Sequence, residues 1–227
     1  MAAKRSSVAG KRPRRTGASP RSAQEPPLSL ERIVATAVEL LDTHGIDGLS
    51  MRRLADRLGA GAMSLYWHVD SKEKVFDLAL DSVLAYRESQ TAGFQDWRED
   101  VVHMLEDWRA CMQRHPWSAS LLPRRALGPN ILGRLEQLSK TLSEAGVADA
   151  DLNAGIWSLW NYVMGATVTR GSFDLSDDDR AAAQRRLTDL SRLYPTIERS
   201  RLLLDDDWDG AFRKGLDFLL DGIAPRP

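Results

Sequence analysis

Apolar residues recur along this sequence at the spacing of an α-helix, and no other feature constrains its fold as strongly. Between residues 30 and 41 they stand three or four positions apart, which places them on one face of a helix. The same spacing returns in later segments, whereas no stretch alternates apolar and polar residues as a half-buried β-strand does. We therefore expect an all-α fold.

The next segment predicts two short helices separated by a tight turn. Apolar residues keep one helical face after Ser50, and Gly59-Ala60-Gly61 interrupts this pattern. A further helix is expected over about residues 62–68, and Ser71 has a suitable side chain to cap the helix after it. A helix, a glycine turn and a second helix form a helix-turn-helix unit, in which the helix after the turn enters the DNA major groove.

The residues around this turn are suited to contacts with DNA. Ala62, Met63 and Ser64 stand at the start of the helix that would enter the groove, whereas Leu65 and Val69 are expected to face the protein. The aromatic side chains that follow have apolar bodies and polar tips, which suit phosphate contacts. The expected DNA-binding residues are Arg52, Ala62, Met63, Ser64, Tyr66, Trp67, His68 and Lys72. An ordinary helical hairpin with a surface aromatic patch is the alternative that spacing leaves open.

Residues 1–27 differ from the rest of the chain in composition and charge. They hold seven Lys or Arg and one acid, Glu25, for a net charge of +6, so the other 200 residues carry −7 of the total of −1. A segment with almost no large apolar side chains cannot fold by burying them. We expect a disordered basic arm that binds a polyanion. A solvated tail without a role is the alternative.

The composition argues against several other classes of protein. Cys111 is the only cysteine, so no internal disulfide is possible, and it is expected to be a core residue. No apolar run approaches the roughly 18 residues of a membrane span, so we expect no membrane partner and a cytoplasmic location. No phosphate loop, nucleophile elbow or helical pair of histidines occurs. We expect no catalytic residues, no metal site and no cofactor.

Residues 28–87 resemble the DNA-binding domain of the tetracycline-repressor (TetR) family of bacterial regulators. The matching stretches are IVATAVELLDTHGIDGLSMRRLADRLG and SLYWHVDSKEKV, and weaker similarity extends past His115-Pro116-Trp117. The resemblance implies an all-α homodimer, in which each subunit has a helix-turn-helix domain over residues 28–88 and a larger domain for ligand binding and dimerisation over residues 89–227. It also implies a repressor that binds a near-palindromic operator and is released by a small molecule.

Two departures from the family pattern affect the expected partners. Ala62 stands where the repressor that gives the family its name has a polar base-reading residue, so we expect a different operator. The loop over residues 121–128 lacks the histidine of that repressor's magnesium–tetracycline site, so we expect a ligand other than tetracycline, of unknown identity. A ligand-independent architectural DNA-binding protein and a transcriptional activator of the same family are the alternative functions.

The C-terminal half is rich in large side chains, which predicts a ligand pocket. Pockets for small molecules are lined by aromatic side chains with a few convergent polar groups. We expect one between the helices predicted over residues 94–115 and 149–169. Its candidate lining residues are His103, Met104, Trp108, Met112, Trp157, Trp160, Asn161 and Met164. For each of them, core packing or the dimer interface is the alternative.

The resemblance also implies where the subunits meet. In this family the interface is a four-helix bundle to which each subunit contributes two helices, and the matching segments are residues 149–169 and 207–223. The last of these segments has an apolar face that is expected to contact the partner. Its residues are Trp208, Phe212, Leu216, Leu219 and Leu220, with Phe218 beside it.

Overall fold

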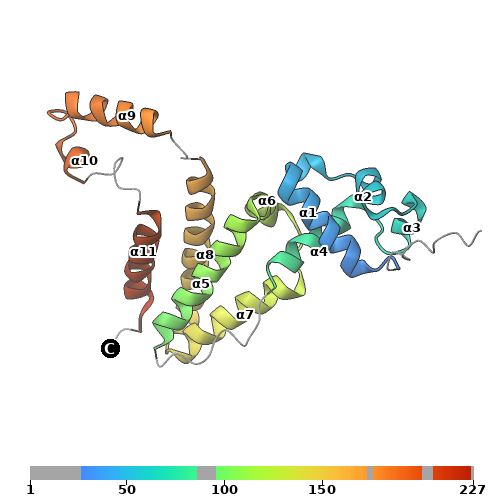
Figure 1. Ribbon diagram of the computed structural model, residues 1–227. Helices are drawn as coiled ribbons and strands as arrows, with labels where there is room; N and C mark the ends of the chain where they lie inside the picture. The colour runs from blue at the N-terminus through green and yellow to red at the C-terminus, as the bar shows by residue number, and fades with distance from the viewer. Residues whose placement is uncertain (1–26, 86–95, 173–175, 201–206, 226–227) are drawn as a thin grey trace, which may run out of the picture.

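The computed structural model describes residues 27–85, 96–172, 176–200 and 207–225. Within these ranges the regular secondary structure is helical and no strand occurs, which confirms the all-α fold. The basic arm predicted over residues 1–27 lies almost wholly outside the described residues. Figure 1 shows four N-terminal helices at one end of the molecule and the remaining helices at the other. We call these two groups the head and the body.

The head consists of α1 (Leu30–Gly48), α2 (Met51–Leu58), α3 (Ala62–Tyr66) and α4 (Lys72–Val83). The hydroxyls of Ser50 and Ser71 accept hydrogen bonds from backbone N–H groups three residues later, so Ser71 acts as the predicted N-cap and Ser50 caps α2 in the same way. Gly59 ends α2 with a left-handed conformation at φ 64°, which glycine adopts without steric cost. The turn before α3 therefore follows directly from the sequence.

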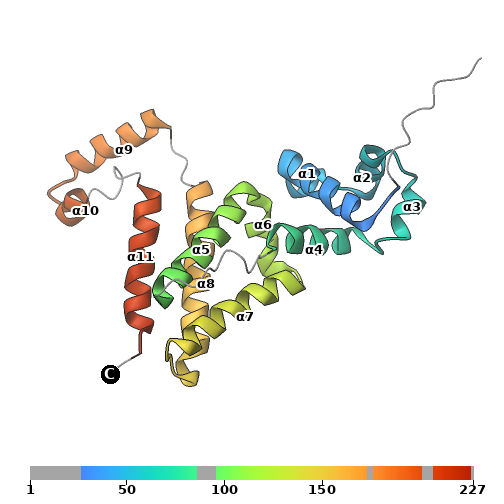
Figure 2. The same cartoon turned by 60° about the horizontal axis from the view of Figure 1, so that its bottom comes forward.

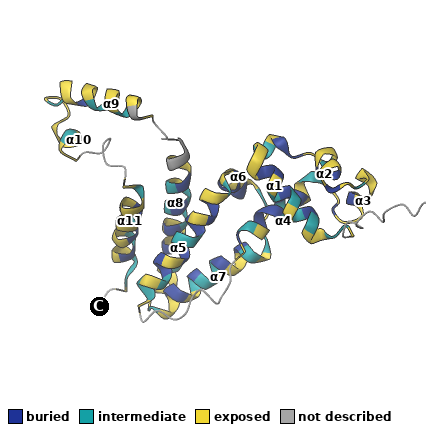
Figure 3. Cartoon of the chain, in the orientation of Figure 1, coloured by how far each residue is buried: buried dark blue, intermediate teal, exposed yellow. Residues whose placement is uncertain are grey.

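The body is built around three long helices, α5 (Trp97–Arg114), α7 (Pro129–Glu144) and α8 (Asp149–Ser172). The short helix α6 (Pro116–Leu121) and a 3₁₀ turn, η2 (Leu122–Arg124), connect α5 to α7. Figures 1 and 2 show α5, α7 and α8 packed together beside the head, with α6 next to α1. Buried residues lie along the shared sides of these helices, as Figure 3 shows.

The C-terminal part contains α9 (Asp177–Asp189), α10 (Pro195–Ser200) and α11 (Trp208–Ile223). In Figures 1 and 2, α9 and α10 lie apart from the other helices, whereas α11 runs beside α8. The last helix begins at Trp208, within the segment expected over residues 207–223. Asp207 caps it, since its carboxylate accepts a hydrogen bond from Gly210 N at 2.9 Å. The sequence pattern did not predict α10.

Close packing of α11 on α8 depends on one aromatic pair and one glycine. The rings of Tyr162 and Phe212 stack at 5.2 Å, and the Tyr162 hydroxyl donates to the Phe212 carbonyl at 3.0 Å. A Cβ atom at Gly215 would collide with that hydroxyl, so only glycine permits this approach. Burial raises the pKa of Tyr162. The phenol is therefore a neutral donor that joins the two helices.

Candidate nucleic-acid interface and effector site

The outer surface of α3 carries large side chains that do not pack against the protein. Trp67 is 88% exposed and Met63 is 77% exposed, and Tyr66 beside them is also exposed. On the opposite side, Leu65 and Val69 are buried, which confirms the prediction that these two residues face the protein. Because they stand four positions apart, they hold one side of the short helix against the head and leave the other in solvent. Ala62 and Ser64 lie on the exposed surface as well.

Adjacent arginines on α2 are both exposed but differ in their contacts. Arg53 donates from Nη1 to the Gly48 carbonyl at 2.9 Å, so its guanidinium is held at the end of α1. Arg52 is exposed at the start of α2. The sequence pattern selected Arg52 for DNA contact, and the geometry gives Arg53 a structural role.

Two further candidates lie at the ends of the loop between α3 and α4. His68 is exposed. The pKa of the Glu31 carboxyl is lowered, mainly by its own backbone N–H and the Ser29 hydroxyl, and the charge of His68 lowers it further. His68 is therefore within electrostatic range of the first turn of α1. Lys72 starts α4, and its Nζ lies 5.1 Å from the centre of the Phe76 ring.

The last turn of α4 is fixed to the start of α7 by one buried carboxylate. Asp81 accepts hydrogen bonds from Asn130 N at 3.0 Å, Ile131 N at 3.3 Å and Asn130 Nδ2 at 2.9 Å. It therefore satisfies N–H groups in the first turn of α7, as an N-cap residue would. A Cβ atom at Gly128 would collide with Asp81, so this glycine permits the contact.

The C-terminal end of α4 is held by side chains of the body. Arg134 of α7 donates from Nε to the Leu84 carbonyl at 2.6 Å and from Nη2 to the Ala85 carbonyl at 3.2 Å. The Cys111 thiol, whose pKa is raised by burial, donates to the Val83 carbonyl. The carbonyls at the C-terminal end of a helix have no partners within the helix, so these side chains supply the hydrogen-bond donors that such carbonyls need. Arg134 also binds Asp107 at 2.8 Å.

Two more polar contacts join the head to the body. Asp42 of α1 binds His115 Nδ1 at 2.8 Å and accepts from Trp117 Nε1 at 2.7 Å. Arg125 binds Asp77 of α4 at 2.7 Å and donates to the Glu73 carbonyl at 2.7 Å. The head is therefore connected through α1 and along α4 to the helices that surround the body's interior.

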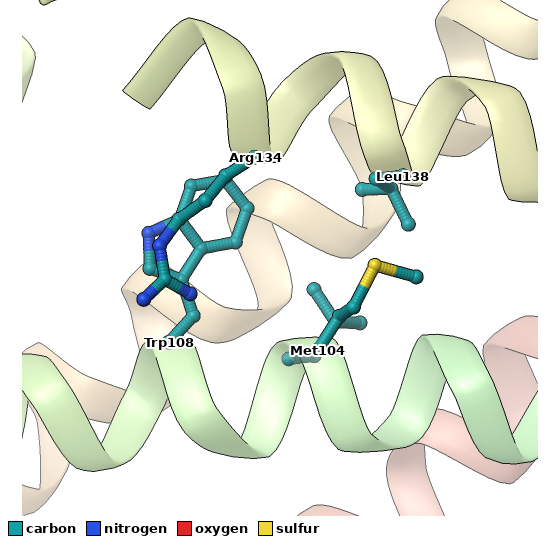
Figure 4. Close-up of a pocket in the computed structure, with 5 residues that line it drawn as sticks. Met104, Trp108, Arg134 and Leu138 are labelled. Atoms are coloured by element: carbon teal, nitrogen blue, oxygen red, sulfur yellow. The ribbon is translucent and has the colours of Figure 1, made fainter. Parts of the chain in front are cut away.

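A small pocket of about 10 Å³ lies between α5 and α7. Its lining residues are Met104, Leu105, Trp108, Arg134 and Leu138. Figure 4 shows Arg134 and Trp108 together at one end of it, with Met104 and Leu138 at the other. Trp108 is 2% exposed, and its indole N–H has no hydrogen-bond partner among the described residues.

The pocket contains only part of the predicted set. Met104 and Trp108 line it, and Trp160 packs edge-on against Trp108 with ring centres 4.9 Å apart. The other predicted residues do not line it. Met112 is buried in the core, Met164 is half-buried, and His103, Trp157 and Asn161 are exposed. The sequence did not predict Arg134 and Leu138 as pocket residues, because the α7 segment shows only the spacing of a helix and no pattern typical of a ligand site.

The apolar face of α11 is covered within the subunit. Phe212, Leu216 and Leu220 are buried, and α11 packs on α8 and α5. The expectation that these residues are left for a partner is therefore wrong, because the subunit's own helices cover them. Trp208 and Leu219 are half-buried, and Phe218 is 66% exposed. An open groove lies beside Phe218 and Leu219, between the start of α8 and the end of α11.

No helix among the described residues is long and apolar enough to cross a membrane. Within the same ranges, no group of three or more His, Cys, Asp or Glu side chains is arranged to hold a metal ion.

Comparison with known families identifies both domains of the chain. Residues 33–79 match the family described as bacterial regulatory proteins of the tetR family, and residues 91–226 match the tetracyclin repressor-like C-terminal domain. The chain belongs to the TetR family. This TetR-family protein has an N-terminal helix-turn-helix domain and a larger C-terminal helical domain, and it is a ligand-responsive DNA-binding transcriptional regulator.

Individual relatives agree with this assignment. An HTH-type transcriptional regulator of Saccharopolyspora erythraea is 37% identical to this TetR-family protein, over 89% of this chain and 87% of the relative. The HTH-type transcriptional repressor DrrR1 of Streptomyces coeruleorubidus is 37% identical over 66% of this chain and 57% of its own length. The crystal structure of Streptomyces coelicolor ActR in complex with (S)-DNPA is similar at a TM-score of 0.70, with 29% identity over 87% of this chain and 98% of ActR.

Proposed function

We propose that the chain is a homodimeric repressor that binds a near-palindromic operator through α3 of each subunit and is released when a small molecule binds its C-terminal domain. The observation that carries this proposal is the exposed outer surface of α3, where Trp67 and Met63 project from a helix anchored by Leu65. The relative DrrR1 is named a repressor, and ActR has been crystallised with (S)-DNPA, which is a precedent for a ligand.

We assign the contacts with DNA by position around α3. Arg52, Ala62, Met63 and Ser64 would face bases, since the start of the helix after the turn enters the groove. The flanking polar and aromatic residues would hold the sugar–phosphate backbone, with Trp67 also close enough to reach bases. These residues are Tyr66, Trp67, His68 and Lys72.

The charge of the head gives the N-terminal arm a role in this proposal. Residues 28–85 hold six Lys or Arg against nine Asp or Glu, so the head is acidic as a whole. Phosphate attraction would then depend on local groups such as Arg52 and on the arm over residues 1–27. Binding that neutralises phosphates weakens steeply as salt rises. Deleting residues 1–27 should therefore lower both the operator affinity and its salt dependence, and an unchanged salt slope would remove the arm from the interface.

The dimer would form over the groove between α8 and α11. Small residues, Gly155 and Ser158 of α8 and Gly222 of α11, line this groove beside Phe218 and Leu219. Small side chains allow helices of two subunits to approach closely, and an exposed phenyl ring gains by burial in such an interface. The interface of this proposal therefore uses Phe218 and Leu219 and not the buried stripe at Phe212, Leu216 and Leu220.

We place the boundary between the DNA-binding and ligand-binding domains at residues 88 and 89. We propose that the protein acts in the bacterial cytoplasm, associated with the nucleoid when bound to DNA. We propose no enzymatic activity.

Selection from random double-stranded DNA tests the proposal, because it requires no knowledge of the controlled genes. The wild-type protein should enrich one near-palindrome, and sedimentation should show one dimer per site. Arg52→Ala should abolish enrichment while the protein still melts cooperatively. Enrichment of unrelated sequences with similar affinities would favour the architectural alternative and contradict the proposal.

A further inference from the structure

We propose that the effector is a ring-bearing apolar acid whose carboxylate binds the Arg134 guanidinium and the Trp108 indole N–H, and that this capture detaches Arg134 from the end of α4. The inference rests on the proposed function, because it names the ligand class and the signal for that same pocket. Neither residue's role follows from the family match.

The chemistry of the pocket points to an acceptor oxygen at one end. Trp108 Nε1 is a buried donor without a hydrogen-bond partner among the described residues, and such a group costs free energy until an acceptor reaches it. Arg134 is 4% exposed and lies at the same end, where Figure 4 shows its guanidinium beside the indole. An indole N–H can only donate, and so can a guanidinium. An anion satisfies both, whereas a cation at this end would be repelled by Arg134.

The other end of the pocket selects an apolar body for the ligand. Met104, Leu105 and Leu138 are buried apolar side chains, and Met104 has a flexible side chain that adapts to a ligand. The enclosed space is about 10 Å³, roughly that of one water and far below the roughly 300–1,000 Å³ of typical ligand sites. Entry of a ring acid therefore requires α5 and α7 to move apart.

Arg134 connects this pocket directly to the DNA-binding head. Its Nε and Nη2 donate to the carbonyls of Leu84 and Ala85, at the end of the helix whose other end adjoins α3. A carboxylate is a stronger acceptor for a guanidinium than a neutral carbonyl, because the hydrogen bond is charge-assisted. Once Arg134 turns to the ligand, the carbonyls directly after α4 lose these donors and the head is freed to move.

Asp107 permits this exchange without leaving a buried charge behind. It binds Arg134 at 2.8 Å, but its side chain is 35% exposed. When the ligand's carboxylate takes over the guanidinium, Asp107 can turn into water. Arg134 keeps an anionic partner throughout, so the exchange avoids the large cost of an unpaired buried charge.

Three matched probes test the ligand class on the full-length protein bound to its selected operator. The probes are 2-naphthoate, 2-naphthamide and 2-naphthylmethylammonium, which share the rings and differ in charge. We expect 2-naphthoate to release the operator, 2-naphthamide to be at least about tenfold weaker, and the ammonium to have no effect. Release by the amide at the same concentration as the acid would overturn the proposal, and so would an operator complex that none of the probes dissociates.

Variants of the two donors test the mechanism. Arg134→Met should bind the acid and the amide equally in calorimetry and should bind the operator more weakly than wild type without any probe. Trp108→Phe removes the N–H and keeps a ring, so it should weaken binding of the acid and the amide alike. Lys140→Met removes one positive charge from the exposed side of the same helix and should leave both properties unchanged.

The outcomes separate this inference from the proposed function. If Arg134→Met does not fold, Arg134→Lys replaces it, and this variant should keep the preference for the acid but bind the operator more weakly. Preference for the acid that survives in Arg134→Met would overturn the inference. A wild-type protein that binds its operator tightly and ignores 2-naphthoate contradicts the inference alone, whereas one that selects no DNA sequence contradicts the proposed function.

Discussion

The two ends of α4 are completed by different kinds of partner. At the N-terminal end, the Ser71 hydroxyl caps the helix and Lys72 reaches partly into solvent beside the exposed surface of α3. At the C-terminal end, two buried side chains of the body donate hydrogen bonds to backbone carbonyls: Arg134 to that of Leu84 and Cys111 to that of Val83. The helix is therefore a rigid element with one end in the DNA-binding head and the other fixed in the protein interior. Changes at the first end should affect binding, and changes at the second should affect stability as well.

The largest effect is expected from Asp81→Ala, which breaks the contact between α4 and α7. The substitution leaves buried N–H groups of Asn130 and Ile131 without their acceptor, and each such loss costs about 1–3 kcal/mol. The free energy of unfolding, measured by urea denaturation, should fall by about 3 kcal/mol. Glu136→Ala, a change at an exposed position of α7, should leave the free energy of unfolding almost unchanged. A loss no larger than that of the control would contradict this role for Asp81.

The next effect distinguishes the adjacent arginines of α2. Arg52→Ala should weaken operator binding by about 1–3 kcal/mol without changing stability, because its side chain is exposed. Arg53→Ala should lower the melting temperature, because it removes the hydrogen bond to the Gly48 carbonyl. Anisotropy titrations and thermal melts of both variants check this pair. Equal effects of the two substitutions on operator affinity would show that the distinction is wrong.

A smaller effect is expected at the exposed ring of α3. Trp67→Ser removes a side chain that packs little against the protein, so the free energy of unfolding should change by less than about 0.5 kcal/mol. Operator binding should nevertheless weaken by about 1 kcal/mol, since the ring and its N–H would lie against DNA. Denaturation and anisotropy measured on the same preparation test both parts. A large loss of stability would mean that the ring is structural.

The smallest effect is expected from Lys72→Ala, at the solvent end of α4. A lysine that contacts one phosphate adds affinity for every DNA sequence alike. Its loss should therefore weaken specific and non-specific binding equally and reduce the slope of log affinity against log salt by about 1. Titrations at several salt concentrations measure this slope. A change confined to the specific operator would indicate a base contact instead.

The sequence predicted the head in detail because local signals determine it. The cap at Ser71 and the break in the helical pattern at Gly59 depend on a few neighbouring residues. The inward placement of Leu65 and Val69 follows from their spacing alone. The resemblance to the TetR family rested on these same residues.

The body was predicted less well, because its site depends on contacts between distant segments. An arginine within a helical pattern ordinarily predicts a solvated side chain, but Arg134 is buried by meeting the carbonyls of Leu84 and Ala85. An apolar stripe at Phe212 and Leu216 shows that a face is covered but not by which helix. The sequence assigned this face to a second subunit, and α8 and α5 of the same subunit cover it.

Hydroxyl-radical footprinting of the protein on its selected operator tests the central claim most directly, since α3 of two subunits must contact DNA together. The account predicts two protected half-sites whose centres are about 10 base pairs apart, or a multiple of one helical turn, on one face of the duplex. Both should vanish with Arg52→Ala. A single protected half-site, or continuous protection that survives this substitution, would contradict the account.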